Sequence, residues 1–175
     1  MRKAFLFILM IVSIALKAQN DPKAQAILNN VSTQYKSYKN LKVEFSLKIE
    51  NKADNVTEEQ KGIVYIKGNK YKVEIGGQEV INDNKNIWTY IKDANEVQIN
   101  AYVEDSESVS PTKIFTMYEK GFMYKFIEEK TENGKTIAVI DLVPANAGKS
   151  FFKVRLTIDK TKKQLISSKI FEKSG

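Results

Sequence analysis

Three carboxylates, Asp83, Glu96 and Asp141, are the side chains that could carry acid–base chemistry in this chain. No spacing brings two of them together, and the acidic residues fall in expected turns or on polar strand faces. The chain contains no histidine and no cysteine. Their absence excludes Cys or His nucleophiles, His general bases and ordinary zinc sites. We therefore expect a protein that is not an enzyme and that uses no cofactor and no metal ion.

Binding of an apolar ligand is the chemistry that the sequence favours. From Leu41 to Tyr102, large apolar residues alternate with charges and amides. Successive side chains of a strand point to opposite faces, so each such ribbon has one apolar and one polar face. A strongly curved sheet of this kind, with no second sheet to cover its apolar face, must close around a core, a helix or a ligand.

The first residues have the pattern of an export signal. Arg2 and Lys3 precede an apolar run from Ala4 to Leu16 that is too short for a comfortable membrane span. We expect cleavage after Ala18, which leaves one domain over residues 19–175; Ser13-Ile14-Ala15 offers an alternative cleavage site. A retained membrane anchor is the alternative. Removing Arg2, Lys3 and Lys17 lowers the formal net charge from +7 to +4. The remaining lysines are scattered among acids, so we expect no nucleic-acid partner.

The elements expected after this segment are one helix, many strands and one short helix. Asp21-Pro22 is typical of a helix start, with Asp as N-cap and Pro at the first helical position. An apolar stripe at three- and four-residue spacing continues the helix to about Asn40. The short helix is predicted from Ser110-Pro111 to Gly121. The expected strands cover residues 41–51, 58–67, 70–76, 78–82, 86–92, 96–102, 122–130, 135–143, 150–159 and 164–171.

Two turns are predicted to set the strand register. Gly68-Asn69 should form a tight hairpin that places Lys67 opposite Lys70. Val64 then faces Val73, and the apolar residues of both strands share one side. Asn133-Gly134 is the strongest hairpin signal in the chain. Between the two meanders, residues 103–110 are acidic and serine-rich and are predicted to form a loop or lid segment.

Several segments of the chain resemble a known protein family. The pieces that carry the resemblance are the strand from Gly62 to Lys67, the Asp-x-Lys-x-x-Trp-x-Tyr segment from Asp83 to Tyr90, Leu142-Val143-Pro144, and the run from Phe152 to Asp159. Together with the order of helix, meander, short helix and meander, they are similar to the periplasmic carriers of outer-membrane lipoproteins, the LolA-like family. The resemblance covers about residues 21–175.

The resemblance implies an α+β fold: an open, incomplete antiparallel β-barrel with the N-terminal helix and the short central helix as its lid. It also implies a periplasmic monomer that holds lipoprotein acyl chains in an apolar cavity. The implied partners are an inner-membrane lipoprotein-releasing ABC complex and an outer-membrane acceptor. A periplasmic lipid- or lipoprotein-sensing regulator or scaffold of the same fold is the alternative. The expected cavity residues are Leu28, Val31, Tyr35, Phe45, Leu47, Val64, Ile66, Tyr71, Val73, Trp88, Tyr90, Ile114, Phe115 and Met117.

Two features depart from the family pattern. Well-known members carry an Arg-Pro pair in the turn where this chain has Lys67-Gly68-Asn69-Lys70. The arginine helps to hold the lid, so a weaker closed state is expected here. The family also continues with a further strand, and we therefore expect that the sequence lacks its last strand or two.

Overall fold

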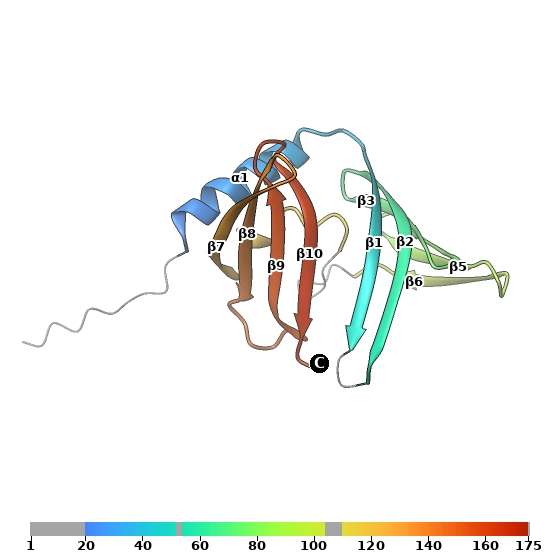
Figure 1. Ribbon diagram of the computed structural model, residues 1–175. Helices are drawn as coiled ribbons and strands as arrows, with labels where there is room; N and C mark the ends of the chain where they lie inside the picture. Colours follow the sequence, from blue (N-terminus) through green and yellow to red (C-terminus); the bar gives the residue numbers. More distant parts are fainter. Residues whose placement is uncertain (1–19, 52–53, 104–109, 175) are drawn as a thin grey trace, which may run out of the picture.

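The computed structural model describes residues 20–51, 54–103 and 110–174. One helix, α1 (Pro22–Lys36), precedes a first group of strands and a second group follows (Figure 1). The first group comprises β1 (Leu41–Asn51), β2 (Val56–Lys67), β3 (Lys70–Ile75), β4 (Gln78–Asn82), β5 (Asn86–Ile91) and β6 (Glu96–Ala101). After the short 3₁₀ helix η1 (Met117–Glu119) come β7 (Phe122–Glu132), β8 (Lys135–Pro144), β9 (Phe151–Asp159) and β10 (Gln164–Glu172).

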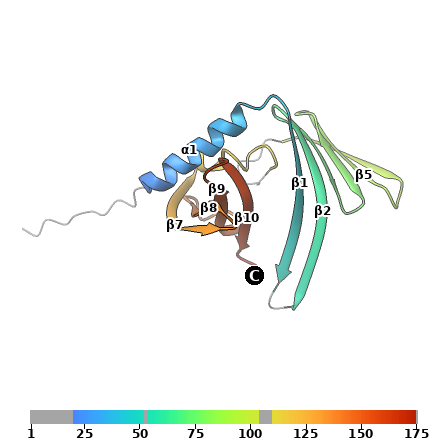
Figure 2. The same cartoon turned by 45° about the horizontal axis from the view of Figure 1, so that its top comes forward.

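The strands form two antiparallel sheets that do not close into a barrel. One sheet has the order β1-β2-β3-β4-β5-β6 and the other has the order β10-β9-β8-β7. The edge strands β1 and β10 lie side by side without a shared ladder, and the six-stranded sheet stands apart from α1 (Figure 2). An ion pair of 3.4 Å between Lys169 on β10 and Glu50 on β1 crosses this gap. The predicted open antiparallel architecture with an N-terminal helix is confirmed.

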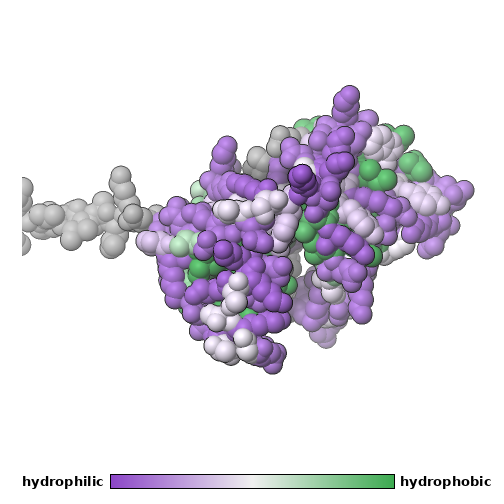
Figure 3. Space-filling model, turned by 90° about the horizontal axis from the view of Figure 1, so that it is seen from above, coloured by the Kyte–Doolittle hydropathy of each residue, from purple (hydrophilic) through white to green (hydrophobic). Residues whose placement is uncertain are grey.

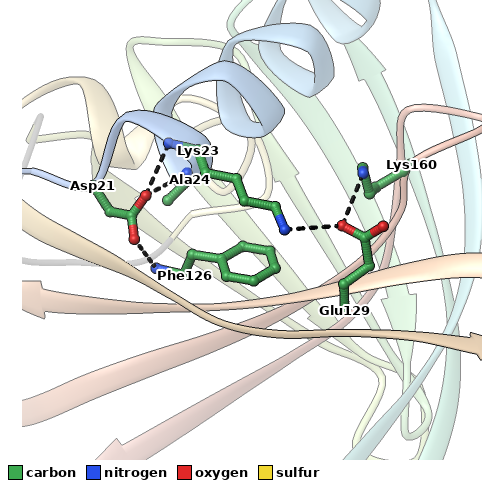
Figure 4. Close-up of polar contacts among 6 residues, drawn as sticks. All are labelled: Asp21, Lys23, Ala24, Phe126, Glu129 and Lys160. Atoms are coloured by element: carbon green, nitrogen blue, oxygen red, sulfur yellow. Dashed lines mark hydrogen bonds and ion pairs between the residues drawn. The ribbon is translucent and has the colours of Figure 1, made fainter.

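Asp21, the predicted N-cap, fixes the start of helix α1 through its side-chain carboxylate. One carboxylate oxygen of Asp21 accepts hydrogen bonds from the backbone N–H groups of Lys23 and Ala24. The other accepts from the N–H of Phe126 on β7, at 3.2 Å (Figure 4). Lys23 and Lys160 both pair with Glu129, at 3.2 and 2.9 Å. The N-cap therefore also ties the helix to the four-stranded sheet.

The buried core lies between α1 and the four-stranded sheet. Its members come from α1, η1 and β7–β9, with the apolar stripe of the helix packed on one sheet face. They are Ala24, Ile27, Leu28, Val31, Tyr118, Tyr124, Ala138, Ile140, Leu142, Phe151, Val154, Leu156 and Ile158. In the described part of the six-stranded sheet, the buried residues are Gly62, Val64 and Asn82. The six-stranded sheet is thus left largely outside the core.

The predicted hairpins are confirmed, whereas the predicted short helix is much shorter than expected. Lys67 pairs with Lys70 and Val64 with Val73, and Gly134 follows Asn133 with a positive φ of 73°. Residues 111–116 form turns, and only Met117–Glu119 is helical. The β-branched Thr112, Ile114 and Thr116 disfavour a helix that is too short to gain from cooperativity.

Two expectations fall outside the described residues: the signal peptide with its cleavage site, and most of the acidic loop at 103–110. Among the described residues, no helix has the length and apolar character needed to cross a membrane.

Candidate apolar binding face

Strand register divides the six-stranded sheet into two faces with different chemistry. Residues that pair across antiparallel strands share a face. One row of paired residues is Val43, Val64, Val73, Val80, Thr89 and Gln98. We call the face that carries this row the valine face. The opposite face carries Trp88, which pairs with Ile81 on β4 and Ile99 on β6, and we call it the tryptophan face.

The valine face changes from aliphatic to polar across the sheet. On β1–β3 the register gives it mainly apolar side chains, which are Leu41, Val43, Phe45, Leu47, Ile49, Val64, Ile66, Tyr71, Val73 and Ile75. The polar side chains Gln60 and Glu58 of β2 lie opposite Leu47 and Ile49 on the same face. On β4–β6 the same face also carries amide and hydroxyl groups, which are Gln78, Asn82, Thr89, Gln98 and Asn100. The surface therefore has an aliphatic part and a polar part on one continuous side of the sheet.

Much of the aliphatic part is open to solvent. Val64 is buried, but Leu47 and Ile49 are 43% and 49% exposed, and Phe45, Tyr71 and Val73 are half-buried. Seen from above, apolar surface is visible between the two halves of the molecule and over the half with the six-stranded sheet (Figure 3). Exposed apolar patches rimmed by polar residues mark interaction sites, and Gln60 and Glu58 border this one.

Close packing of Phe45 on Gly62 shapes this face. The two residues pair across β1 and β2. A Cβ atom at position 62 would lie 2.7 Å from Phe45 Cζ and 2.7 Å from the carbonyl oxygen of Glu74. Only glycine allows the aromatic ring to lie against the backbone here. The sequence signal for this contact is an isolated glycine within a strand pattern.

Trp88 and Tyr90 do not share a face with the other predicted cavity residues of the sheet. The prediction that Trp88 lies with Val64, Ile66, Tyr71 and Val73 is wrong, because the register places it on the tryptophan face. Tyr90 pairs with Glu79 and Val97 on that same face.

The tryptophan face has the reverse distribution of polarity. On β1–β4 it carries charged groups such as Lys72, which lies 2.8 Å from both Glu74 and Glu79. On β4–β6 it carries exposed apolar side chains, among them Ile81, Val97 and Ile99, which are 41%, 54% and 63% exposed. The two apolar surfaces of the sheet are therefore separate and lie on opposite sides.

The predicted residues of α1 lie with the four-stranded sheet. Leu28 and Val31 are buried in the core described above, and Met117 packs against it. Tyr35 stacks on Phe115 with 3.5 Å between ring centroids, and burial raises the pKa of the Tyr35 hydroxyl. Ile114 is half-buried in the same segment of turns. These residues pack with α1 and the four-stranded sheet and are not on the six-stranded sheet that carries the valine face.

Hydrogen bonds join the segment around η1 to helix α1. Glu119 accepts hydrogen bonds from Lys36 at 2.6 Å and from Ser32 at 2.8 Å. The bond from Lys36 is the main cause that holds the pKa of Glu119 below its ordinary value. Tyr118 donates to the side-chain oxygen of Asn29 at 3.0 Å. The segment and the helix are therefore joined as one layer.

The other candidate features are an open depression in the six-stranded sheet and the carboxylates Asp83, Glu96 and Asp141. An open depression of ≈ 690 Å³ lies at β1–β4, but charged Glu44, Lys61, Glu74 and Lys92 line much of it, so it suits acyl chains poorly. Asp83 accepts from the N–H groups of Lys85 and Asn86 in a turn. Asp141 pairs with Arg155 on the other sheet. Glu96, at the start of β6, accepts a hydrogen bond from the side-chain amide of Gln98 at 3.2 Å. The described residues hold no group of three potential metal ligands.

The fold is an open pair of antiparallel sheets with a partly exposed aliphatic face on the six-stranded sheet. The family model described as outer membrane lipoprotein carrier protein LolA matches residues 18–173. The chain belongs to this family, as the sequence resemblance predicted. The family description names a carrier, not a reaction. No curated protein matches the chain.

Solved structures with a similar arrangement share little sequence with this chain. A LolA superfamily protein from Nitrosomonas europaea is 14% identical, covering 87% of this chain and 73% of that one, with a TM-score of 0.43. A DUF1329 family protein from Desulfovibrio piger is 12% identical over 86% and 74%, with a TM-score of 0.47. The MucA/MucB complex from Pseudomonas aeruginosa gives 12% identity over 87% and 52%, with a TM-score of 0.41.

Proposed function

We propose that the protein is a periplasmic carrier that shields the acyl chains of lipidated proteins on the valine face. The observation that carries this proposal is the exposed aliphatic surface of β1–β3, which the protein's own core leaves uncovered. Each methylene of an acyl chain gains about 0.8 kcal/mol when it is buried from water. A sheet that offers this surface suits reversible, non-covalent binding.

The weak connection between the two sheets supports loading and release. The ion pair between Lys169 on β10 and Glu50 on β1 joins exposed side chains, and exposed ion pairs contribute little stability. Gly68-Asn69 also supplies no arginine to lock the layer of α1 and η1 over the sheet. In the proposed cycle an inner-membrane lipoprotein-releasing complex loads the carrier, and an outer-membrane acceptor removes the cargo.

A lipid- or lipoprotein-sensing regulator of the same fold is the second candidate. The exposed apolar patch on the tryptophan face favours it, because an acyl carrier needs no second apolar surface on the far side of its binding sheet. A regulator would use such a surface to contact a protein partner after it had bound lipid.

Tryptophan fluorescence tests the binding face directly. The chain has a single tryptophan, so the emission reports on Trp88 alone. We expect a quenching acyl lipopeptide to leave wild-type emission nearly unchanged, because Trp88 lies on the tryptophan face. In the double variant Trp88→Phe/Thr89→Trp, the indole moves to the valine face, and the same ligand should quench it strongly. Strong quenching of Trp88 in the wild type, with none of the relocated indole, would contradict the proposal.

A further inference from the structure

Asn82 carries a buried amide nitrogen that has no partner. The residue is 1% exposed and ends β4 on the valine face, where it pairs with Tyr71 on β3 and Ile87 on β5. Among the described residues, Asn82 Nδ2 has no hydrogen-bond acceptor. Buried polar groups in proteins are nearly always hydrogen-bonded, so an orphaned donor calls for a specific explanation.

The orientation of the amide is fixed by the turn that follows. Asn82 Oδ1 accepts a hydrogen bond from the backbone N–H of Asn84 at 2.7 Å. The reversed amide would set a donor against that N–H, so the hydrogen-bond network assigns the two atoms. Serine or threonine could accept the same hydrogen bond in this turn, so the turn does not require the NH₂ group of Asn82.

The position of Asn82 within the sheet indicates what the amide could bind. Its row across the valine face runs Leu41, Ile66, Tyr71, Asn82, Ile87 and Asn100. Asn82 is the first polar side chain after the aliphatic strands β1–β3. An ester- or amide-linked acyl chain has the same sequence of groups along its length. Its apolar hydrocarbon ends at a polar carbonyl group, whose oxygen accepts hydrogen bonds.

We propose that Asn82 Nδ2 donates a hydrogen bond to the carbonyl oxygen of an ester- or amide-linked acyl chain bound on the valine face. This inference rests on the proposed function and adds to it a polar anchor and a direction for the ligand. The hydrocarbon then lies over β1–β3, and the linkage to the rest of the lipidated protein lies toward β4–β6. Asn82 is closed off from solvent without ligand, so neighbouring side chains on this face move aside on binding.

The test compares two fluorescent lipids that differ only at the carbonyl, a palmitoyl ester and the corresponding hexadecyl ether. Wild-type protein should bind the ester about three- to tenfold more tightly, the effect of one hydrogen bond. In Asn82→Ala this preference should fall to about one, with little change in affinity for the ether. Asn100→Ala removes an exposed amide from the same face and serves as the matched control, which should keep the wild-type preference.

The outcomes separate the proposed role of Asn82 from the proposed binding of acyl chains on the valine face. Equal wild-type affinities for ester and ether, or a preference that survives in Asn82→Ala, would overturn the role of Asn82 but leave acyl binding intact. Failure of the wild type to bind either lipid would overturn the proposed function together with this inference. If Asn82→Ala does not fold, Asn82→Ser keeps an acceptor for the turn without the longer amide NH₂ group, and its preference for the ester should also fall.

Discussion

Replacing Leu47 with glutamate is expected to weaken acyl-chain binding by at least about tenfold, because burial of a leucine is lost and a carboxylate must be desolvated against hydrocarbon. Leu47 lies on the valine face of β1 and is 43% exposed. The free energy of unfolding should change by only about 0.5 kcal/mol, as is usual for exposed positions. Titration with a fluorescent palmitoyl lipopeptide measures the affinity.

Ile81→Glu is the matched control for this variant. Ile81 is 41% exposed, nearly the same as Leu47, but it lies on the tryptophan face. The same charge on the opposite side of the sheet should leave acyl affinity at the wild-type value. Equal losses of affinity in the two variants would show that the effect is not specific to the valine face.

Truncating Leu142 should have the largest effect on stability. Leu142 is fully buried in the core between α1 and the four-stranded sheet. A buried Leu→Ala change costs about 2–5 kcal/mol of unfolding free energy, through lost burial and the cavity left behind. Under conditions in which the variant stays folded, its affinity for acyl ligand should equal that of the wild type. Urea unfolding and ligand titration measure the two quantities.

Val73→Ala should show the opposite pattern. Val73 is half-buried in the aliphatic part of the valine face. Loss of two methyl groups from the ligand contact should weaken acyl binding by about tenfold, at about 0.8 kcal/mol per group. The cost in unfolding free energy should be about 1 kcal/mol or less. If Leu142→Ala weakened binding as much as Val73→Ala, the core and the binding surface could not be separate.

Much of the sheet could be predicted from the sequence because its turns are explicit. A two-residue turn at Gly68-Asn69 leaves one register in which Val64 faces Val73, and the structure confirms it. The Asp21-Pro22 start of α1 was equally clear, because capping chemistry is local in sequence. These features depend on residues within a few positions of one another.

The face of Trp88 could not be predicted in the same way. Residues 87–91 are Ile, Trp, Thr, Tyr and Ile, so polarity does not alternate and either face would serve as the apolar one. The side on which Trp88 lies depends on how many residues the turns at 76–77 and 83–85 contain. Pairing of Asn82 with Ile87 puts Trp88 on the far side.

The sheet that packs against α1 also could not be predicted from the local sequence pattern. The stripe through Leu28 and Val31 predicts that one side of the helix is buried, but it does not specify which sheet covers it. The structure places that side on the four-stranded sheet, where Asp21 and Lys23 also make contacts. Tertiary packing settles the choice, because both sheets present apolar residues.

The most direct test of acyl binding on the valine face is paramagnetic broadening of methyl resonances. The protein would be labelled at its isoleucine, leucine and valine methyl groups and loaded with a lipopeptide that carries a nitroxide near the end of its acyl chain. We predict strong broadening for Val43, Val64 and Val73, and little for Val97 and Ile99 on the far side of the sheet. Broadening of Val97 and Ile99 with the valine-face methyls unaffected would contradict the account.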